Sequence, residues 1–137
     1  MLKNIAILFI LASLSVHGNG QDVIKFRAFQ TTYYTEYTSE LEWSDVDILV
    51  VFYTSPEKVR VFAKTEKNID LIKSGKDTKN KDGNIVMNFS GIDENGRRCN
   101  VQIVKYKANE NSDQEHKLTL IIIYSDVTLV YRLKDNN

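Results

Sequence analysis

The chain is predicted to be an all-β protein, an antiparallel meander of eight or nine strands that closes into a small barrel. Apolar and polar residues alternate with period two over most of the chain after residue 22, which is the pattern of half-buried strands. No segment shows the 3.6-residue apolar period of an amphipathic helix. Turn residues recur between the short strand-like runs. Such a meander loses its exposed edges most simply by closing into a barrel, with a two-sheet sandwich as the alternative.

The first 20 residues differ from the rest of the chain. Lys3 supplies a positive charge, residues 5–12 are apolar, and Gly18 and Gly20 follow as small residues. This order is typical of a cleaved secretory signal peptide, and the apolar run is shorter than the about 20 residues that span a bilayer. We expect a signal peptide over 1–20 and a single all-β domain over 21–137. We also expect export to the periplasm or the extracellular space, with no stable membrane insertion after cleavage.

The charge and the cysteine content limit the binding partners and the cellular environment that the sequence predicts. The chain holds 18 basic and 18 acidic residues, so no net charge draws it toward nucleic acid. Cys99 is the only cysteine, which rules out a disulfide within the chain and favours a bacterial setting over a eukaryotic secreted domain. It is in phase with Val101 and Ile103, and we expect it to be a small buried side chain on a strand.

The N-terminal half is expected to hold three strands and one ambiguous segment. Val23–Thr38 alternates and is rich in threonine and tyrosine, which suit a pleated surface. Asp47–Thr54 is apolar on both faces, as in a strand covered on both sides. After a turn at Ser55–Glu57, Lys58–Lys64 alternates cleanly. Asn68–Lys73 fits a strand or a helical turn equally well.

The C-terminal half is expected to form hairpins. Lys81–Asn84 has turn composition, and the Asn-Gly pair within Asp93–Gly96 predicts a tight hairpin in which both central residues need positive φ. A polar loop, 109–115, precedes a last hairpin across Ser125 and Asp126. The strands that these turns connect are Ile85–Phe89, Arg97–Lys107, Lys117–Tyr124 and Val127–Lys134.

No catalytic, cofactor or metal motif stands out, and we expect neither enzymatic activity nor a cofactor. A Cys99–His116 pair is geometrically possible on consecutive strands, but the polar neighbours of His116 indicate a solvated imidazole, and no nucleophile-elbow pattern accompanies it. One histidine and one cysteine do not complete a zinc site. The acidic pairs Asp45/Asp47 and Asp93/Glu94 lack the alternating oxygen ligands of a calcium loop.

Aromatic residues are the remaining lead. Rings with a polar tip suit the mouth or lining of a ligand cavity, and they equally suit packing within a barrel. Trp43 precedes the most apolar strand, so we expect it near a barrel end, where it would plug the barrel or stack on a ligand. The candidate ligand-binding residues are Trp43, Tyr33, Tyr37, Tyr53, Tyr106 and Tyr124.

Two segments carry a resemblance: Glu42–Val50 (EWSDVDILV) and Gly91–Val101 (GIDENGRRCNV). The mature chain resembles short secreted proteins of the Bacteroidota and of the phages that infect them, which implies a setting and no particular activity. In size and meander it is also similar to the lipocalin and fatty-acid-binding barrels, although no glycine lies two residues before Trp43 as in the lipocalin Gly-x-Trp signature. This second likeness implies an eight-stranded barrel able to hold one small ligand.

Two functions follow as hypotheses. The first is a secreted or periplasmic binding module that holds a small apolar ligand in a lipocalin-like barrel. The second is an envelope or phage-associated interaction factor, or an inhibitor, that binds another protein through its surface. The second hypothesis is based on the tract Thr31–Thr38, which would offer a strand edge open to pairing with a strand of another protein. The oligomeric state is left open, and a hydrolase built on Cys99 and His116 is a distant third.

Overall fold

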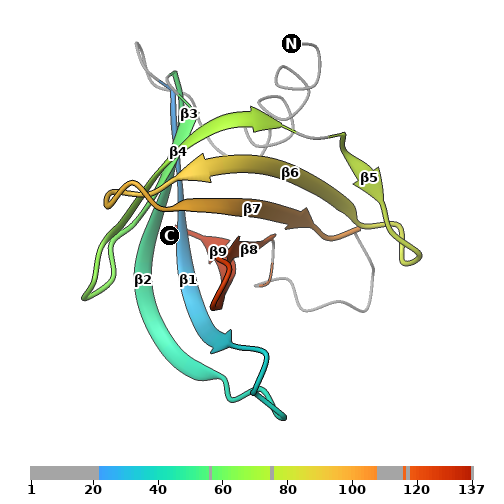
Figure 1. Ribbon diagram of the computed structural model, residues 1–137. Coiled ribbons are helices and arrows are strands. Elements are labelled where there is room, and N and C mark those ends of the chain that lie inside the picture. Colours follow the sequence, from blue (N-terminus) through green and yellow to red (C-terminus); the bar gives the residue numbers. More distant parts are fainter. Residues whose placement is uncertain (1–21, 56, 75, 108–115, 117, 137) are drawn as a thin grey trace.

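A computed structural model describes residues 22–55, 57–74, 76–107, 116 and 118–136, and within them every regular element is a β-strand (Figure 1). All pairings are antiparallel, so the predicted all-β meander is confirmed. The strands are β1 (Val23–Tyr34), β2 (Ser44–Thr54), β3 (Glu57–Val61), β4 (Lys67–Ser74), β5 (Thr78–Lys79), β6 (Ile85–Ile92), β7 (Arg98–Lys105), β8 (Leu118–Ile123) and β9 (Thr128–Asp135).

The sheet closes on itself. Its order is β4-β3-β2-β1-β9-β8-β7-β6-β5, and β4 also pairs with β6. Eight strands therefore form a closed barrel, and β5 is an additional short strand on the edge of β6. The predicted barrel is confirmed over the sandwich alternative. Closure leaves no edge along most of the barrel wall, which is the physical advantage of the arrangement.

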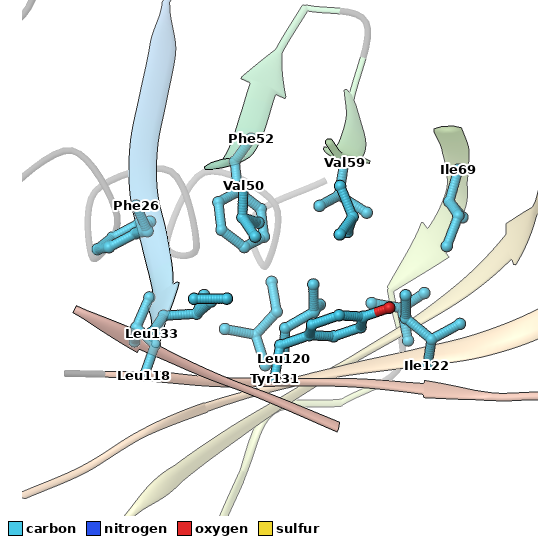
Figure 2. Packing of buried hydrophobic residues seen from close by; sticks show 14 of the residues in the cluster. Phe26, Val50, Phe52, Val59, Ile69, Leu118, Leu120, Ile122, Tyr131 and Leu133 are labelled. Carbon is cyan, nitrogen blue, oxygen red and sulfur yellow. The ribbon is translucent and has the colours of Figure 1, made fainter. Parts of the chain in front are cut away.

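The barrel interior is filled by side chains from all eight strands. The inward positions follow the period-two pattern, and Phe26 of β1 meets Phe52 of β2 edge to face, with ring centroids 5.8 Å apart. In Figure 2, side chains from β1–β4 face those of β8 and β9 across the core. Residues with 0 % exposure come from every barrel strand: Ala28, Val50, Val59, Val61, Ile69, Met87, Val101, Ile103, Leu118, Leu120, Ile122 and Leu133.

A β-bulge interrupts β1. Ala28 pairs with Leu133, and Gln30 pairs with the adjacent Arg132, so Phe29 is the extra residue. A bulge shifts the side-chain alternation by one position and increases the local twist. Beyond it, Gln30 lies on the outer face beside Arg132.

Two hairpins use the same turn. In one, Asp93 accepts hydrogen bonds from the N–H groups of Asn95 and Arg97, both at 2.9 Å. In the other, Asn80 accepts from the N–H groups of residues 82 and 84, both at 3.0 Å. Among the described residues only Gly83 and Gly96 have positive φ. The predicted hairpins are confirmed, but the expectation of positive φ at both central residues is wrong, because the Asx side chain stabilises a wider turn with a single left-handed glycine.

Several boundaries differ from the expected ones. β1 ends at Tyr34 and not at Thr38, because the N–H of Thr38 bonds to the carbonyl of Thr35 and reverses the chain. The ambiguous segment Asn68–Lys73 is part of strand β4. The predicted signal peptide, the loop over 109–115 and Lys117 lie outside the described residues.

Candidate functional site

One end of the barrel is closed by a buried carboxylate. The side chain of Asp93 accepts a 2.8 Å hydrogen bond from the hydroxyl of Tyr124, in addition to the two turn N–H groups. The ammonium group of Lys67 lies 3.8 Å away. Burial alone raises the pKa of Asp93, but the bonds from Tyr124 and the turn, with the charge of Lys67, hold that pKa below its usual value. Burial, followed by the bond to Asp93, raises the pKa of Tyr124, so the phenol stays protonated.

Beyond this closed end, the β1–β2 hairpin reaches past the other strands (Figure 1). We call the segment Thr31–Ile48 the long hairpin. Four of the seven exposed large hydrophobic side chains in the described residues belong to it. Tyr37 is 88 % exposed, Tyr33 is 69 % exposed and Leu41 is 49 % exposed, and Tyr34 is the fourth. This clustering of rings on a projecting element is the most distinctive surface feature, since most exposed apolar side chains on soluble proteins are scattered singly.

The long hairpin is also strongly acidic. Residues 31–47 contain no lysine or arginine. In a chain with equal numbers of acids and bases, this one-sided charge is local and creates a negative potential at the projecting end. The acidic residues of the segment are Glu36, Glu40, Glu42, Asp45 and Asp47.

The base of the long hairpin is anchored on the outer face of the barrel. The guanidinium of Arg132 stacks 3.8 Å from the ring centroid of Trp43 and donates a 2.8 Å bond to Gln30. Gln30 donates in turn to Asp45 at 3.3 Å. The hydroxyl of Thr32 donates to the carbonyl of Glu42 at 2.7 Å. These contacts join β9, β1 and β2. They indicate that the base of the long hairpin has a fixed position relative to the barrel.

A small pocket lies where the long hairpin meets the β8–β9 turn. It has a volume of about 140 Å³ and is lined by Tyr34, Thr35 and Glu36 on one side and by residues 124–128 on the other. Drug-sized ligands occupy pockets of about 300–1,000 Å³. This pocket therefore has room for one side chain of a partner, and Glu36 is one of its lining residues.

The predicted ligand-binding residues do not line one cavity. Trp43 stacks on Arg132 outside the barrel, the ring of Tyr53 lies under the ammonium of Lys58 at 4.9 Å, and Tyr106 is a surface residue that bonds to a threonine of β8. Tyr124 is buried at the closed end. Tyr33, Tyr37 and Trp43 belong to the long hairpin, and of these Tyr33 and Tyr37 have strongly exposed rings. A role of these residues in ligand binding stays a prediction.

The barrel interior offers no support for an enclosed ligand. Side chains with 0 % exposure have no surface that a water-sized sphere can reach, and such side chains come from each of the eight barrel strands. The space among these described residues is therefore packed as protein interiors usually are. The hypothesis of a small apolar ligand inside the barrel stays a prediction, and the packing among these twelve residues does not support it.

Cys99 and His116 are not brought together. Cys99 faces the core beside Gly91, and burial raises the pKa of its thiol to about 11. His116 lies against the rings of Tyr106 and Phe29 and bonds to Thr119 at 2.9 Å. Leu118 and Leu120 point into the barrel, so Thr119 between them points outward. His116, which bonds to Thr119, therefore lies against the outer face of the barrel.

The described residues were compared with the requirements of a metal site and of a membrane-spanning helix. Within the described residues, no three or more His, Cys, Asp or Glu side chains gather as they would around a metal ion. The pair Asp93/Glu94 belongs to the hairpin turn, where Glu94 lies 3.7 Å from Lys67. The same part of the chain holds no helix with the length and apolar character to cross a membrane.

Comparison with protein-family models, curated proteins and solved structures found no match. The surface residues of the long hairpin that were not predicted as candidates from the sequence are Tyr34, Leu41, Glu36, Glu40 and Glu42. A signal for them was present in the sequence, since a stretch of 17 residues without any basic residue is unusual in a chain with 18 lysines and arginines.

Proposed function

We propose that this protein is a small exported binding module that recognises another protein through its long hairpin. The observation that carries the proposal is the cluster of exposed Tyr33, Tyr37 and Leu41 on a projecting, anchored hairpin. Tyrosine is enriched at the centres of protein interfaces, because its ring buries a large area while its hydroxyl forms hydrogen bonds. The pocket of about 140 Å³ beside the hairpin would accept a side chain from the same partner.

The packed barrel interior supports a surface-based function over a carrier function. A carrier needs empty space inside the barrel to hold its ligand. Core side chains on all eight strands have zero exposure, so no such space borders these residues. The barrel then serves as a rigid support, which holds the long hairpin in one orientation and lowers the entropy lost on binding.

The proposal is tested by site-specific photo-cross-linking in the cells that produce the protein. A photoreactive phenylalanine analogue replaces Tyr37, and in a control protein it replaces Lys81, which is exposed in the turn between β5 and β6. We expect a discrete protein adduct at position 37 and none at position 81. Absence of any adduct at 37 would contradict the proposal.

Native mass spectrometry of the same preparation tests the alternative. A small apolar molecule that co-purifies with the folded protein and leaves on unfolding would make the protein a carrier. The triple variant Tyr33→Ser, Tyr37→Ser and Leu41→Ser would then keep that molecule, whereas under our proposal the same variant loses its protein adducts.

A further inference from the structure

We propose that the partner contributes an extended basic segment, with alternating basic and apolar residues, which adds as a strand to the free edge of β2. This inference rests on the proposed function, since it names the partner of the same long hairpin. Its starting point is a difference in length between neighbouring strands. β2 runs from Ser44 to Thr54, but β3 pairs with it only from Val50 to Thr54.

The free edge starts just before Leu49. The carbonyl of Leu49 accepts the last hydrogen bond along this edge, from the N–H of Phe62 at 2.9 Å. No described strand pairs with Ser44–Ile48 on that side. Five residues of strand extend about 17 Å, which is enough for a short partner segment to form a register.

The backbone groups on this edge point outward for pairing. Successive residues of a strand direct their N–H and C=O groups to alternate edges. The register shift between β1 and β2 falls between Ile48 and Asp45, but the side chains of residues 45–48 still alternate between exposed and partly buried. Since Leu49 bonds across the edge toward β3, Asp47 and Asp45 therefore direct their backbone groups to the same edge. An antiparallel partner strand would therefore form four hydrogen bonds, two with each aspartate, as in other cases of strand addition.

Side-chain chemistry defines the partner. Asp45 and Asp47 are exposed on the outer face, whereas Val46 and Ile48 are partly buried and pack on the core from the inner face. Directly opposite residues of an antiparallel pair share a face and interact. A bound strand therefore places basic side chains beside the two aspartates and apolar ones beside Val46 and Ile48.

Existing contacts of the two carboxylates leave them available. Asp47 lies 3.5 Å from Arg27, but its side chain is 83 % exposed, and within the described part of the chain Asp45 accepts one side-chain hydrogen bond, from the amide of Gln30. Exposed pairs of this kind are weak. The rest of the long hairpin adds Glu36, Glu40 and Glu42 without any basic residue.

A second copy of this chain is a poor occupant of the same edge. Two-fold antiparallel pairing centred on Val46 places Asp45 of one copy opposite Asp47 of the other, and like charges directly opposite each other destabilise a strand pair. Acidic residues on an edge strand oppose self-association in this way. The same repulsion turns into attraction when the added strand is basic.

The probe is a fluorescein-labelled peptide of nine alternating lysine and valine residues with blocked ends, and its control replaces every lysine by glutamate. We expect the lysine peptide to bind with an affinity that falls as salt rises, and the glutamate peptide not to bind. On binding, the amides of Asp45 and Asp47 should gain protection from hydrogen exchange in NMR spectra. Equal binding of both peptides, or protection only at β5, would overturn the inference.

Three variants separate charge from backbone pairing. The double variant Asp45→Lys, Asp47→Lys should weaken binding by about tenfold or more. Asp47→Pro should weaken it as well, because proline removes an N–H that faces only the free edge. The control Asp82→Lys makes one such aspartate-to-lysine change in the exposed turn between β5 and β6, half the charge change of the double variant, and should leave binding unchanged. Thermal unfolding shows that each variant is folded.

The two proposals fail differently. A protein adduct at Tyr37 combined with no binding of the lysine peptide would overturn the strand-addition inference and leave the interaction function standing. If the peptide binds at Asp45 and Asp47 but no adduct forms at Tyr37 in cells, the proposed function falls while the chemistry of the edge holds.

Discussion

Replacing Asp93 should test whether the closed end of the barrel depends on one buried charge. This carboxylate accepts three hydrogen bonds, from the Tyr124 hydroxyl at 2.8 Å and from the N–H groups of Asn95 and Arg97 at 2.9 Å. Its side chain is fully buried and lies 3.8 Å from the Lys67 ammonium. Truncation to alanine leaves all three donors without their acceptor.

The size of the effect follows from these contacts. A hydrogen bond to a charged group contributes about 1.5–3 kcal/mol, and a buried donor left unpaired adds its desolvation cost. The Tyr124 hydroxyl contributes its full desolvation cost because it is buried. The N–H groups of the turn contribute less because water can reach part of the turn. We expect Asp93→Ala to lower the free energy of unfolding by about 3–5 kcal/mol. Asp93→Asn keeps an acceptor for the turn but loses the charge, and we expect a loss of about 1–2 kcal/mol.

The pH dependence has a definite sign. The pKa of Asp93 in the folded protein lies below its ordinary value of 3.8, so the folded state favours the ionised form. The stabilisation is then fully present above about pH 4 and is lost as the pH falls through the folded pKa. The difference in stability between wild type and Asp93→Asn should be constant from pH 7 to about pH 5 and should shrink at lower pH.

Urea unfolding followed by circular dichroism at several pH values measures both effects. Asn80→Ala is the matched control, because Asn80 stabilises the same kind of turn with a neutral, exposed side chain. Its cost should be about 1 kcal/mol or less and independent of pH. A loss for Asp93→Ala no larger than that of the control, or a gap to Asp93→Asn that widens below pH 4, would refute the reasoning.

Three further predictions follow from the core. The Cys99 thiol, buried and with a pKa of about 11, should not react with iodoacetamide at pH 8 until urea unfolds the protein; rapid labelling of the folded protein would contradict this. Leu120→Ala should cost about 3–5 kcal/mol in urea unfolding, because Leu120 is fully buried, and a cost below about 1 kcal/mol would show that the core is looser than described. Gly91→Ala should lower the free energy of unfolding by about 3 kcal/mol, since a Cβ there would lie 2.6 Å from a methyl group of Ile69. Gly96→Ala should lower it by about 1 kcal/mol, because Gly96 has open space around it but a φ of 78°. Equal losses for the two variants would show that steric contact is not the cause.

Much of the fold could be predicted because it depends on local patterns. The alternation of Val59 and Val61 with charged residues determines which face of β3 is buried, and Asp-x-x-Gly sequences at Asp93 and Asn-x-x-Gly at Asn80 determine where hairpins form. Barrel closure followed from strand number and from the cost of free edges. These features need only neighbours in the sequence or a count of strands.

The rest depends on contacts between distant residues. The residue Phe29, which is extra relative to β9, has no sequence signature, yet its bulge changes which residues of β1 face outward. The Asp93–Tyr124 bond joins residues 31 positions apart. Whether a tyrosine is buried like Tyr124 or exposed like Tyr37 depends on how far each strand extends past its neighbours, and alternation within one strand carries no information on that length.

Closure of the barrel through its first and last strands has a consequence for how the chain acquires its structure. The bond from Arg132 to Gln30 spans 102 residues, so β1 has no β9 to pair with until β9 itself has left the ribosome. Contacts of such long sequence separation form slowly. We expect the emerging polypeptide to remain open until β9 has been synthesised. A nascent chain stopped before β9 should accordingly be degraded or aggregate, because β1 and β8 would both present unsatisfied edges.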